Sequence, residues 1–324
     1  MSTPVTPRPL AAQVPDRDTR EPGPRVDDPG FLGGIALAAF GAIAFSGKAI
    51  IVKLAYRYGA DAITLIALRM LVALPFFATT AVVVHLRGAP PLSRADRWRI
   101  AGLGFLGYYL ASYLDFLGLA YVSASLERLI LYLSPTLVLL IGMLFFGRRA
   151  NARQLIALVI GYLGVVVAFA HDLRVGGSDV LLGSALVFAS ALAYAIYLVG
   201  SGELVARVGS IRLTALASSV ASLCCIVQFA VTRPWTMLWS QPFEVYELSL
   251  LNGTLCTVIP VFAVMMGVQR VGASVASQVG MVGPVSTIVL AALILRETLG
   301  PYQIVGTILV MIGVFVVSQS RSAR

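Results

Sequence analysis

The chain has 324 residues, of which 58% are hydrophobic and 12% charged, and its formal net charge is +9. A soluble domain carries roughly 25% charged residues, so this composition excludes a globular enzyme with a water-facing surface. The arginines collect in short segments between apolar runs, which indicates loops that anchor a membrane protein and does not indicate a nucleic-acid partner.

The chain begins with a polar segment that is rich in Pro, Arg and Asp. It lacks the apolar middle and the small-residue cleavage site of a signal peptide, so we expect residues 1–30 to be a disordered cytoplasmic tail. From residue 31 onward, apolar runs of about twenty residues follow one another, and each is long enough to cross a bilayer as a helix. The predicted transmembrane helices cover residues 31–54, 62–86, 99–121, 124–147, 152–171, 179–201, 208–232, 246–269, 272–295 and 301–319.

An internal repeat relates the two halves of the chain at one constant offset of 149 residues. The offset aligns several pairs, among them Gly34 with Gly183, Gly104 with Gly253, Gly118 with Gly267, and Pro135 with Pro284. Five helices per repeat is an odd number, so the second repeat must be inverted relative to the first. The sequence therefore predicts an all-α integral membrane protein of about ten transmembrane helices, built as two inverted five-helix repeats over residues 31–171 and 179–319.

The distribution of basic residues predicts how the helices are oriented. If the N-terminus is inside, the loops on the cytoplasmic side hold about twice as many basic residues as the loops on the opposite side. We therefore expect a multi-pass protein of the inner (plasma) membrane that has both termini in the cytoplasm.

Two prolines lie at repeat-related positions near the middle of predicted helices. Pro135 and Pro284 each remove a backbone donor, and the carbonyl that this leaves free needs a new partner within the protein. Matched interruptions in both halves point to a substrate site, so we expect the prolines to line a central cavity together with Tyr132, Ser134 and Met281. A kink that only shapes helix packing is the alternative.

Charged side chains inside predicted helices are candidates for substrate binding or coupling, because burying a charge in a bilayer is costly. Lys48, Arg69 and Asp115 are expected to be buried or to face a cavity, and Tyr108 shares a helical face with Asp115. We expect the surplus of Lys48 and Arg69 to attract an anionic group of the substrate, such as a carboxylate. Asp115 is the candidate for a coupling proton.

A charge network is predicted around these candidates. Lys53, Glu127 and Arg128 lie near helix ends on the same predicted side of the membrane, and Asp115 and Glu127 are expected to balance two of the basic groups. One alternative is that Lys53, Glu127 and Arg128 reach the membrane interface by snorkelling. A second alternative is a purely structural ion network that closes the outward gate.

No motif in the sequence indicates a cofactor or a metal. Gly102, Gly104 and Gly107 spell G-x-G-x-x-G, but no strand precedes them and they lie within an apolar run, so close helix packing explains them better than a dinucleotide site. The three cysteines lie in apolar stretches without metal-ligand spacing, and we expect them to be packing residues.

Several short segments together resemble a known family of membrane proteins. They cover residues 45–54, 65–71, 121–125, 133–136, 271–274, 283–284 and 295–297. In this order the chain resembles the EamA-like family of the drug/metabolite transporter superfamily over roughly residues 31–320. The resemblance implies a ten-helix basket of inverted repeats that exports metabolites, amino acids or drugs.

The resemblance also bears on single residues. Lys53 and Arg69 stand where the family often has a lysine and an arginine. Arg148 stands where the family usually has a glutamate at the end of the fourth helix, whereas Glu297 retains the glutamate in the second half. The resemblance does not name a substrate, because the substrates of the family differ widely.

These observations predict a secondary transporter, an exporter of small polar metabolites, amino acids or drugs that works by alternating access. Its partners are a small-molecule substrate and the lipid bilayer, and a homodimer is left open. A membrane-embedded enzyme is one alternative, but it needs clustered His, Asp or Cys at membrane depth, which the sequence lacks. A non-transporting structural membrane protein is another, and it leaves the intramembrane charges without a function.

Overall fold

The computed structural model describes residues 29–146, 152–176, 179–297 and 300–322, and its regular elements are helices. The expected tail lies outside the described residues, apart from positions 29 and 30. The first half contains α1 (Pro29–Arg57), α2 (Ala62–Leu86), α3 (Arg94–Gly104), η1 (Phe105–Leu110), α4 (Ala111–Leu119), α5 (Ala124–Leu131), α6 (Ser134–Phe146) and α7 (Ala152–Gly176). The second half contains α8 (Asp179–Val208), α9 (Ser210–Thr232), α10 (Thr236–Trp239), α11 (Phe243–Gly253), η2 (Thr254–Val258), α12 (Ile259–Val279), α13 (Val282–Leu290), η3 (Ala291–Leu295) and α14 (Pro301–Ser322).

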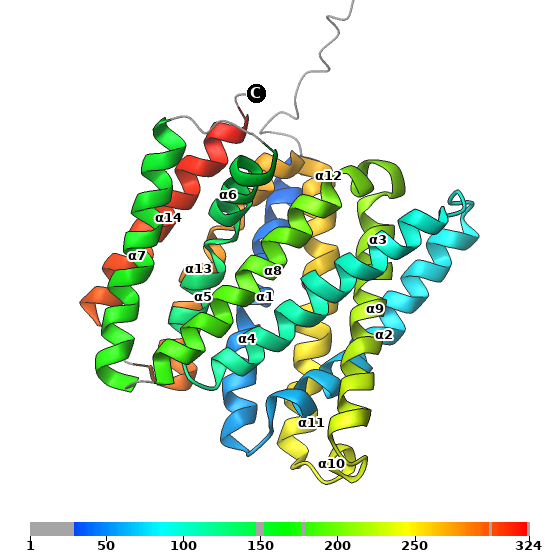
Figure 1. Cartoon of the computed structure of the whole chain (residues 1–324), viewed down its shortest axis with the longest axis horizontal. Helices are drawn as coiled ribbons and strands as arrows, with labels where there is room; N and C mark the ends of the chain where they lie inside the picture. The colour runs from blue at the N-terminus through cyan, green and yellow to red at the C-terminus, as the bar shows by residue number, and fades with distance from the viewer. Residues whose placement is uncertain (1–28, 147–151, 177–178, 298–299, 323–324) are drawn as a thin grey trace, which may run out of the picture.

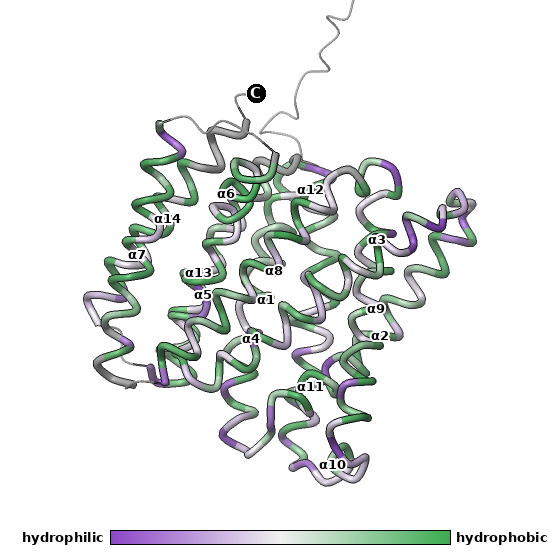
Figure 2. The backbone as a smooth tube through the Cα atoms, viewed as in Figure 1, coloured by the Kyte–Doolittle hydropathy of each residue, from purple (hydrophilic) through white to green (hydrophobic). Residues whose placement is uncertain are grey.

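The helices form one bundle whose length and composition suit a membrane. Figure 1 shows that α1 begins and α14 ends at the same end of the bundle, and that α8 runs opposite to α1. Within the described residues, 8 helices are long and apolar enough to span a bilayer. The other two predicted spans correspond to shorter apolar helices, Val282–Leu295 and Pro301–Val316, so length alone does not confirm the count of ten. Figure 2 shows hydrophobic residues along most of the helices, with hydrophilic segments gathered at the ends of the bundle.

Helix crossings at glycine follow the internal repeat. A Cβ on Gly267 of α12 would lie 3.0 Å from the carbonyl oxygen of Gly34 in α1. A Cβ on Gly118 of α4 would lie 2.8 Å from the carbonyl oxygen of Gly183 in α8. These two crossings involve residues that the offset of 149 aligns, and each joins a helix of one half to a helix of the other. Small residues at both crossings let the backbones approach closely.

A π-helical turn interrupts the same helix in each half. η1 and η2 begin at Phe105 and Thr254, directly after the aligned glycines 104 and 253. In η2 the hydroxyl of Thr257 donates to the carbonyl oxygen of Asn252, five residues back, at 2.7 Å. Such π turns widen the helix locally and are frequent at functional sites. Here they carry Tyr108 and Thr257, which both take part in the polar contacts described below.

A predicted helix is interrupted near each of the two repeat-related prolines. Between α5 and α6 the chain turns at residues 132–133, and between α12 and α13 it turns at residues 280–281. Pro135 is the second residue of α6 and Pro284 the third residue of α13. Proline is tolerated in the first turn of a helix, so each proline begins a new helix where the sequence analysis expected a bend within one.

Side-chain hydroxyls satisfy the two carbonyls that the prolines leave free. The hydroxyl of Ser134 donates to the carbonyl oxygen of Leu131, four residues before the first proline, at 2.6 Å. The hydroxyl of Tyr132 donates to the carbonyl oxygen of Gly280, four residues before the second proline, at 2.6 Å. The second of these bonds joins the two interruptions to each other, so the breaks in the two repeats lie side by side.

Several predicted helix ends are wrong; α1 and α8, for example, continue past the expected ends at 54 and 201 to Arg57 and Val208. Two further boundaries differ for a reason that helix capping explains. Helix α3 begins at Arg94 and not at residue 99, because the hydroxyl of Ser93 caps it by accepting from the backbone nitrogen of Asp96 at 3.0 Å. Helix α12 continues to Val279, through the boundary that was expected at residues 270–271. The related boundary in the first half carries the N-cap Ser123, whereas the aligned position 272 is glycine and has no capping oxygen.

Glu297 caps α5 from the other half of the chain. Its carboxylate accepts from the backbone nitrogen of Ala124 at 2.9 Å and from the hydroxyl of Ser125 at 3.0 Å. A carboxylate at a helix N-terminus satisfies unpaired donors and interacts favourably with the helix dipole. Position 148, which aligns with Glu297, lies outside the described residues.

We expect Glu297→Ala to lower the free energy of unfolding by about 1 kcal/mol, the usual cost of losing a helix cap. The loss would appear as a reduced thermal midpoint of the purified protein in detergent. Glu244 is the matched control, because it is exposed in the first turn of α11. Equal midpoints for Glu297→Ala and Glu244→Ala would contradict a capping role.

Candidate functional site

A cavity of about 420 Å³ lies between helices of both halves. Its lining is largely apolar and aromatic, and the residues that form it are Gly41, Ala42, Phe45, Tyr108, Arg128, Leu131, Tyr132, Tyr194, Thr214, Pro260, Val261, Val264, Met265 and Gly280. The volume falls in the range of small-molecule sites, which is roughly 300–1,000 Å³. Leu131, Tyr132 and Gly280 belong to the two proline interruptions, so the broken helices form part of the wall.

The cavity lies near the middle of the helices that line it, and the buried charges follow on the side away from the start of α1. Its lining residues on α1 end at Phe45, and Lys48 follows about one turn farther toward the opposite end. On η1 and α4 the order is the same, because Tyr108 lines the cavity and Asp115 lies farther along. A cluster of buried charges therefore separates the cavity from the opposite end of the bundle.

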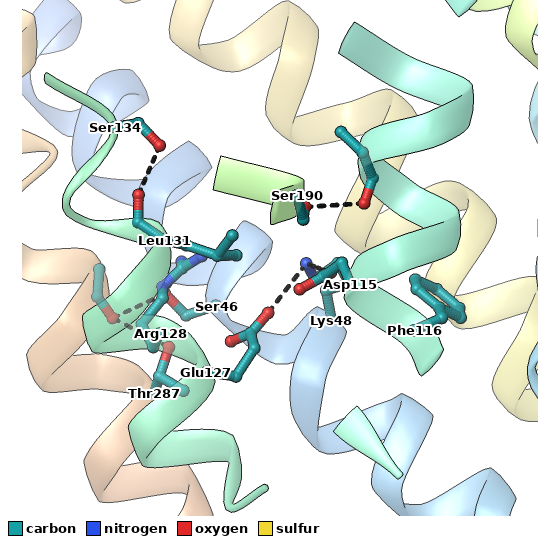
Figure 3. A network of polar contacts seen from close by, with 12 residues as sticks. Ser46, Lys48, Asp115, Phe116, Glu127, Arg128, Leu131, Ser134, Ser190 and Thr287 are labelled. Atoms are coloured by element: carbon teal, nitrogen blue, oxygen red, sulfur yellow. Dashed lines mark hydrogen bonds and ion pairs between the residues drawn. The ribbon is translucent and has the colours of Figure 1, made fainter. Parts of the chain in front are cut away.

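Lys48 stands at the centre of this cluster, between two carboxylates (Figure 3). Its ammonium donates to Oδ2 of Asp115 and lies 3.1 Å from Oε1 of Glu127. Lys48 is 5% exposed, Asp115 3% and Glu127 0%. The oxygens of Glu127 and Oδ1 of Asp115 accept no hydrogen bond from the described residues. The ammonium therefore supplies most of what keeps two acids charged in a buried place.

Arg128 follows Glu127 on α5 and lines the cavity. Its Nη2 donates to the hydroxyl of Ser46 at 2.8 Å, and its guanidinium carbon lies 5.5 Å from the centre of the Phe45 ring. The Ser46 hydroxyl also lies 2.8 Å from the carbonyl oxygen of Gly283. Nε of Arg128 has no partner, and none of the ion pairs between described residues includes this side chain.

Arg69 lies apart from the cavity. Its Nε donates to the hydroxyl of Thr257 in η2 at 2.9 Å, and its guanidinium carbon lies 5.2 Å from the centre of the Phe116 ring. Nη1 of Arg69 is buried without a partner among the described residues. Lys53 lies farther along α1 than Lys48 and is half-buried. Neither of these basic residues contributes to the cavity lining.

The structure divides the predicted site residues into two groups. Tyr108 and Tyr132 line the cavity, as does Arg128, which the sequence analysis assigned to the charge network. The other predicted substrate or coupling residues lie outside the lining, and these are Lys48, Arg69, Asp115, Ser134, Pro135, Met281 and Pro284. Of these, Met281 packs in an apolar cluster beside Tyr132, and Ser134 is occupied by its bond to Leu131.

Some lining residues were not predicted. Phe45 and Gly41 stand one helical turn apart on α1, as do Pro260 and Val264 on α12. This spacing places each pair on one helix face, but it occurs on every apolar helix. Tyr194 offered a weak signal, because a tyrosine in the middle of a membrane span needs a polar partner.

Within the described ranges, no group of three or more His, Cys, Asp or Glu side chains is placed to hold a metal ion. The buried polar groups of the site are a lysine, an arginine, two carboxylates and several hydroxyls. Such a set can bind and release an organic solute or a proton, and it offers no ligand arrangement typical of a transition metal.

Comparisons with known proteins agree with this architecture. The family model described as the EamA-like transporter family matches residues 32–170 and again residues 181–319. The "Uncharacterized transporter YcbK" of Bacillus subtilis (strain 168) is 30% identical over 287 residues, which is 84% of this chain and 88% of the relative. An "Uncharacterized transporter" of Archaeoglobus fulgidus is 24% identical over 71% of this chain and 82% of its own. A solved crystal structure aligns with a TM-score of 0.60 at 18% identity, over 89% of this chain and 98% of the other.

Proposed function

Because this chain belongs to the EamA-like transporter family, we propose that it is a secondary transporter that works by alternating access and binds its substrate in the cavity beside Arg128. The observation that carries this proposal is the position of the cavity. It lies where the broken helices of both repeats meet, and transporters built from inverted repeats bind their substrates at such a place.

The buried charges support an alternating-access cycle in which each end of the bundle is closed in turn. In the described state the Lys48 cluster lies between the cavity and the opposite end of the bundle, so it acts as a closed gate there. Opening that end requires the Lys48 ion pairs to separate or to move with one repeat. Asp115 and Glu127 are the candidate groups for a coupling proton, because both are buried and retain oxygens that accept no hydrogen bond.

The basic residues of the loops predict how the protein is oriented in the membrane, and the orientation predicts the direction of transport. With both termini in the cytoplasm of a cell whose inner membrane holds the protein, the Lys48 cluster lies on the outward side of the cavity, so in this state the cavity is closed toward the outside. The substrate then enters from the cytoplasm and leaves outside, which makes the protein an exporter of small metabolites, amino acids or drugs. An enzyme has less support, because the cavity lining offers no nucleophile paired with a base.

Cysteine labelling in intact membranes tests the cavity. In a chain whose three native cysteines are replaced, Val264→Cys should react with a small water-soluble thiol reagent, because Val264 lines the cavity and is 36% exposed. Leu293→Cys is the matched control: Leu293 is 73% exposed, but it should face lipid, where a thiol stays protonated and unreactive. Ser134→Cys should also stay unlabelled, because Ser134 is buried at 7% exposure.

The labelling pattern decides between a water-filled path and a packed interior. Reaction at Val264→Cys that a transported solute slows would support the proposal directly. An inert Val264→Cys, in a protein whose loop cysteines react, would remove the support for a substrate path through this cavity. Labelling of Leu293→Cys at the same rate as Val264→Cys would show that the reagent does not distinguish a water-filled cavity from a lipid-facing surface.

A further inference from the structure

The lining of the cavity specifies a class of substrate. Resting on the proposed function, we propose that the cavity binds an organic monoanion, a carboxylate attached to an apolar and preferably aromatic body, and that Arg128 is its anchoring residue. The proposal goes beyond a general transport role, because it excludes amines and zwitterions as the preferred substrates.

The charge balance singles out Arg128. Among the described residues that line the cavity, Arg128 is the one with a charged side chain, and none of them carries a carboxylate. The nearest acids on the neighbouring helices, Asp115 and Glu127, are both directed at Lys48. Arg128 is 7% exposed and has no ion pair among the described residues, so its charge attracts an anion strongly, because water screens it little.

The guanidinium also has unused hydrogen-bonding capacity. Within the described part of the chain, Nη2 donates to the hydroxyl of Ser46, and Nε is buried without an acceptor. Guanidinium groups bind carboxylates through two parallel N–H···O bonds. A substrate carboxylate would supply the missing acceptor and would remove a cost that the empty site carries.

The rest of the lining suits the apolar body. Phe45, Tyr194, Val261, Val264 and Met265 offer ring faces and aliphatic surface. Two tyrosine hydroxyls are already engaged inside the protein, since that of Tyr108 lies 3.2 Å from Tyr197 and that of Tyr132 donates to Gly280. These tyrosines therefore present their rings more than their polar ends.

A substrate ammonium finds no counter-charge in this cavity. Without a lining carboxylate, an amine would have to bind through ring faces alone while Arg128 repels it. A zwitterionic amino acid would gain the contact with Arg128 but would bury its ammonium without a partner, which is costly. The monoanion is thus the member of a charge series that pays neither penalty.

A charge series on one body tests the proposal in purified protein. Calorimetric titration with phenylacetate, phenethyl alcohol, phenethylamine and phenylalanine keeps the ring constant and varies the charge. We expect phenylacetate to bind roughly 10- to 100-fold more tightly than the alcohol, the usual range for a charge-assisted hydrogen-bonded contact. Phenylalanine and phenethylamine should bind more weakly than phenylacetate.

Three variants assign the effect to one side chain. Arg128→Met should reduce phenylacetate binding to the level of the alcohol, and Arg128→Lys should restore part of the preference because it restores the charge. Arg69→Met is the matched control: Arg69 is a buried arginine outside the cavity, and its loss should leave the order of affinities unchanged.

The wild-type series keeps the test decisive even if Arg128→Met fails to fold. If phenethylamine or phenylalanine binds more tightly than phenylacetate, the proposed substrate class is wrong. It is also wrong if phenylacetate does not bind. Neither result would touch the transport proposal, which the labelling of Val264→Cys tests separately. A preference for phenylacetate that persists in a folded Arg128→Met protein would overturn the role of Arg128.

Discussion

Replacing Lys48 with methionine is expected to abolish transport and to remove most of the folded protein. The change leaves Asp115 and Glu127 buried without the ammonium that pairs with both of them. Removing one partner of a buried ion pair costs about 3–5 kcal/mol, because the remaining charge stays out of water without compensation. That loss is a large part of the total stability of a typical protein. Size-exclusion profiles of detergent extracts and solute flux into proteoliposomes measure the two effects.

Neutralising one acid should rescue folding. In Lys48→Met/Glu127→Gln one acid of the cluster, Asp115, is left without the ammonium, where Lys48→Met leaves two, so we expect the yield of folded protein to recover in part. Transport should stay low, because the gate has lost its ion pairs. Recovery of both folding and transport would show that the charges are dispensable, and the proposed gate would then be wrong.

A surface ion pair offers the control for this experiment. Arg207 lies 2.8 Å from Asp96, but its side chain is 54% exposed. Exposed pairs contribute roughly 0–1 kcal/mol, so Arg207→Met should have little effect on the yield. Equal losses for Lys48→Met and Arg207→Met would contradict the special cost of the buried cluster.

The repeat was predictable from the sequence because its matching residues recur at one constant spacing along the chain. Gly118 and Gly267 align at a constant offset, and so do Pro135 and Pro284, whatever their neighbours in space. The structure adds why these residue types recur: the glycines lie at close crossings of α4 with α8 and of α12 with α1, and the prolines begin new helices. A sequence pattern of this kind survives because both halves meet the same packing problem.

The cavity was harder to predict, because a sequence does not say which charges pair. Lys48, Arg69 and Arg128 are all basic residues within predicted helices, and the sequence analysis assigned the substrate's anionic group to Lys48 and Arg69. In the structure Lys48 lies between two acids, while Arg128 is left with a hydroxyl. Only the three-dimensional arrangement of α1, α4 and α5 separates the neutralised cation from the one that faces the cavity.

Leucine at the repeat-related glycines should have the second large effect. A Cβ on Gly118 would lie 2.8 Å from the carbonyl oxygen of Gly183, and a Cβ on Gly267 would lie 3.0 Å from that of Gly34. Backbone atoms cannot move aside as the end of a flexible side chain can, so the helices must separate. Overpacking a tight contact costs about 1–3 kcal/mol and more where backbone must shift, so we expect both variants to lose most of their folded protein.

Gly102→Leu provides the control for these leucine variants. A Cβ at Gly102 would meet nothing within 4 Å, and the position that aligns with it in the second half, 251, already carries leucine. This substitution should therefore leave the size-exclusion profile and the thermal midpoint unchanged. Gly118→Leu and Gly267→Leu should resemble each other, because each places the same group at a crossing between the two halves. If one variant loses most of its folded protein and the other loses none, the two crossings contribute unequally to stability, although their glycines align in the sequence.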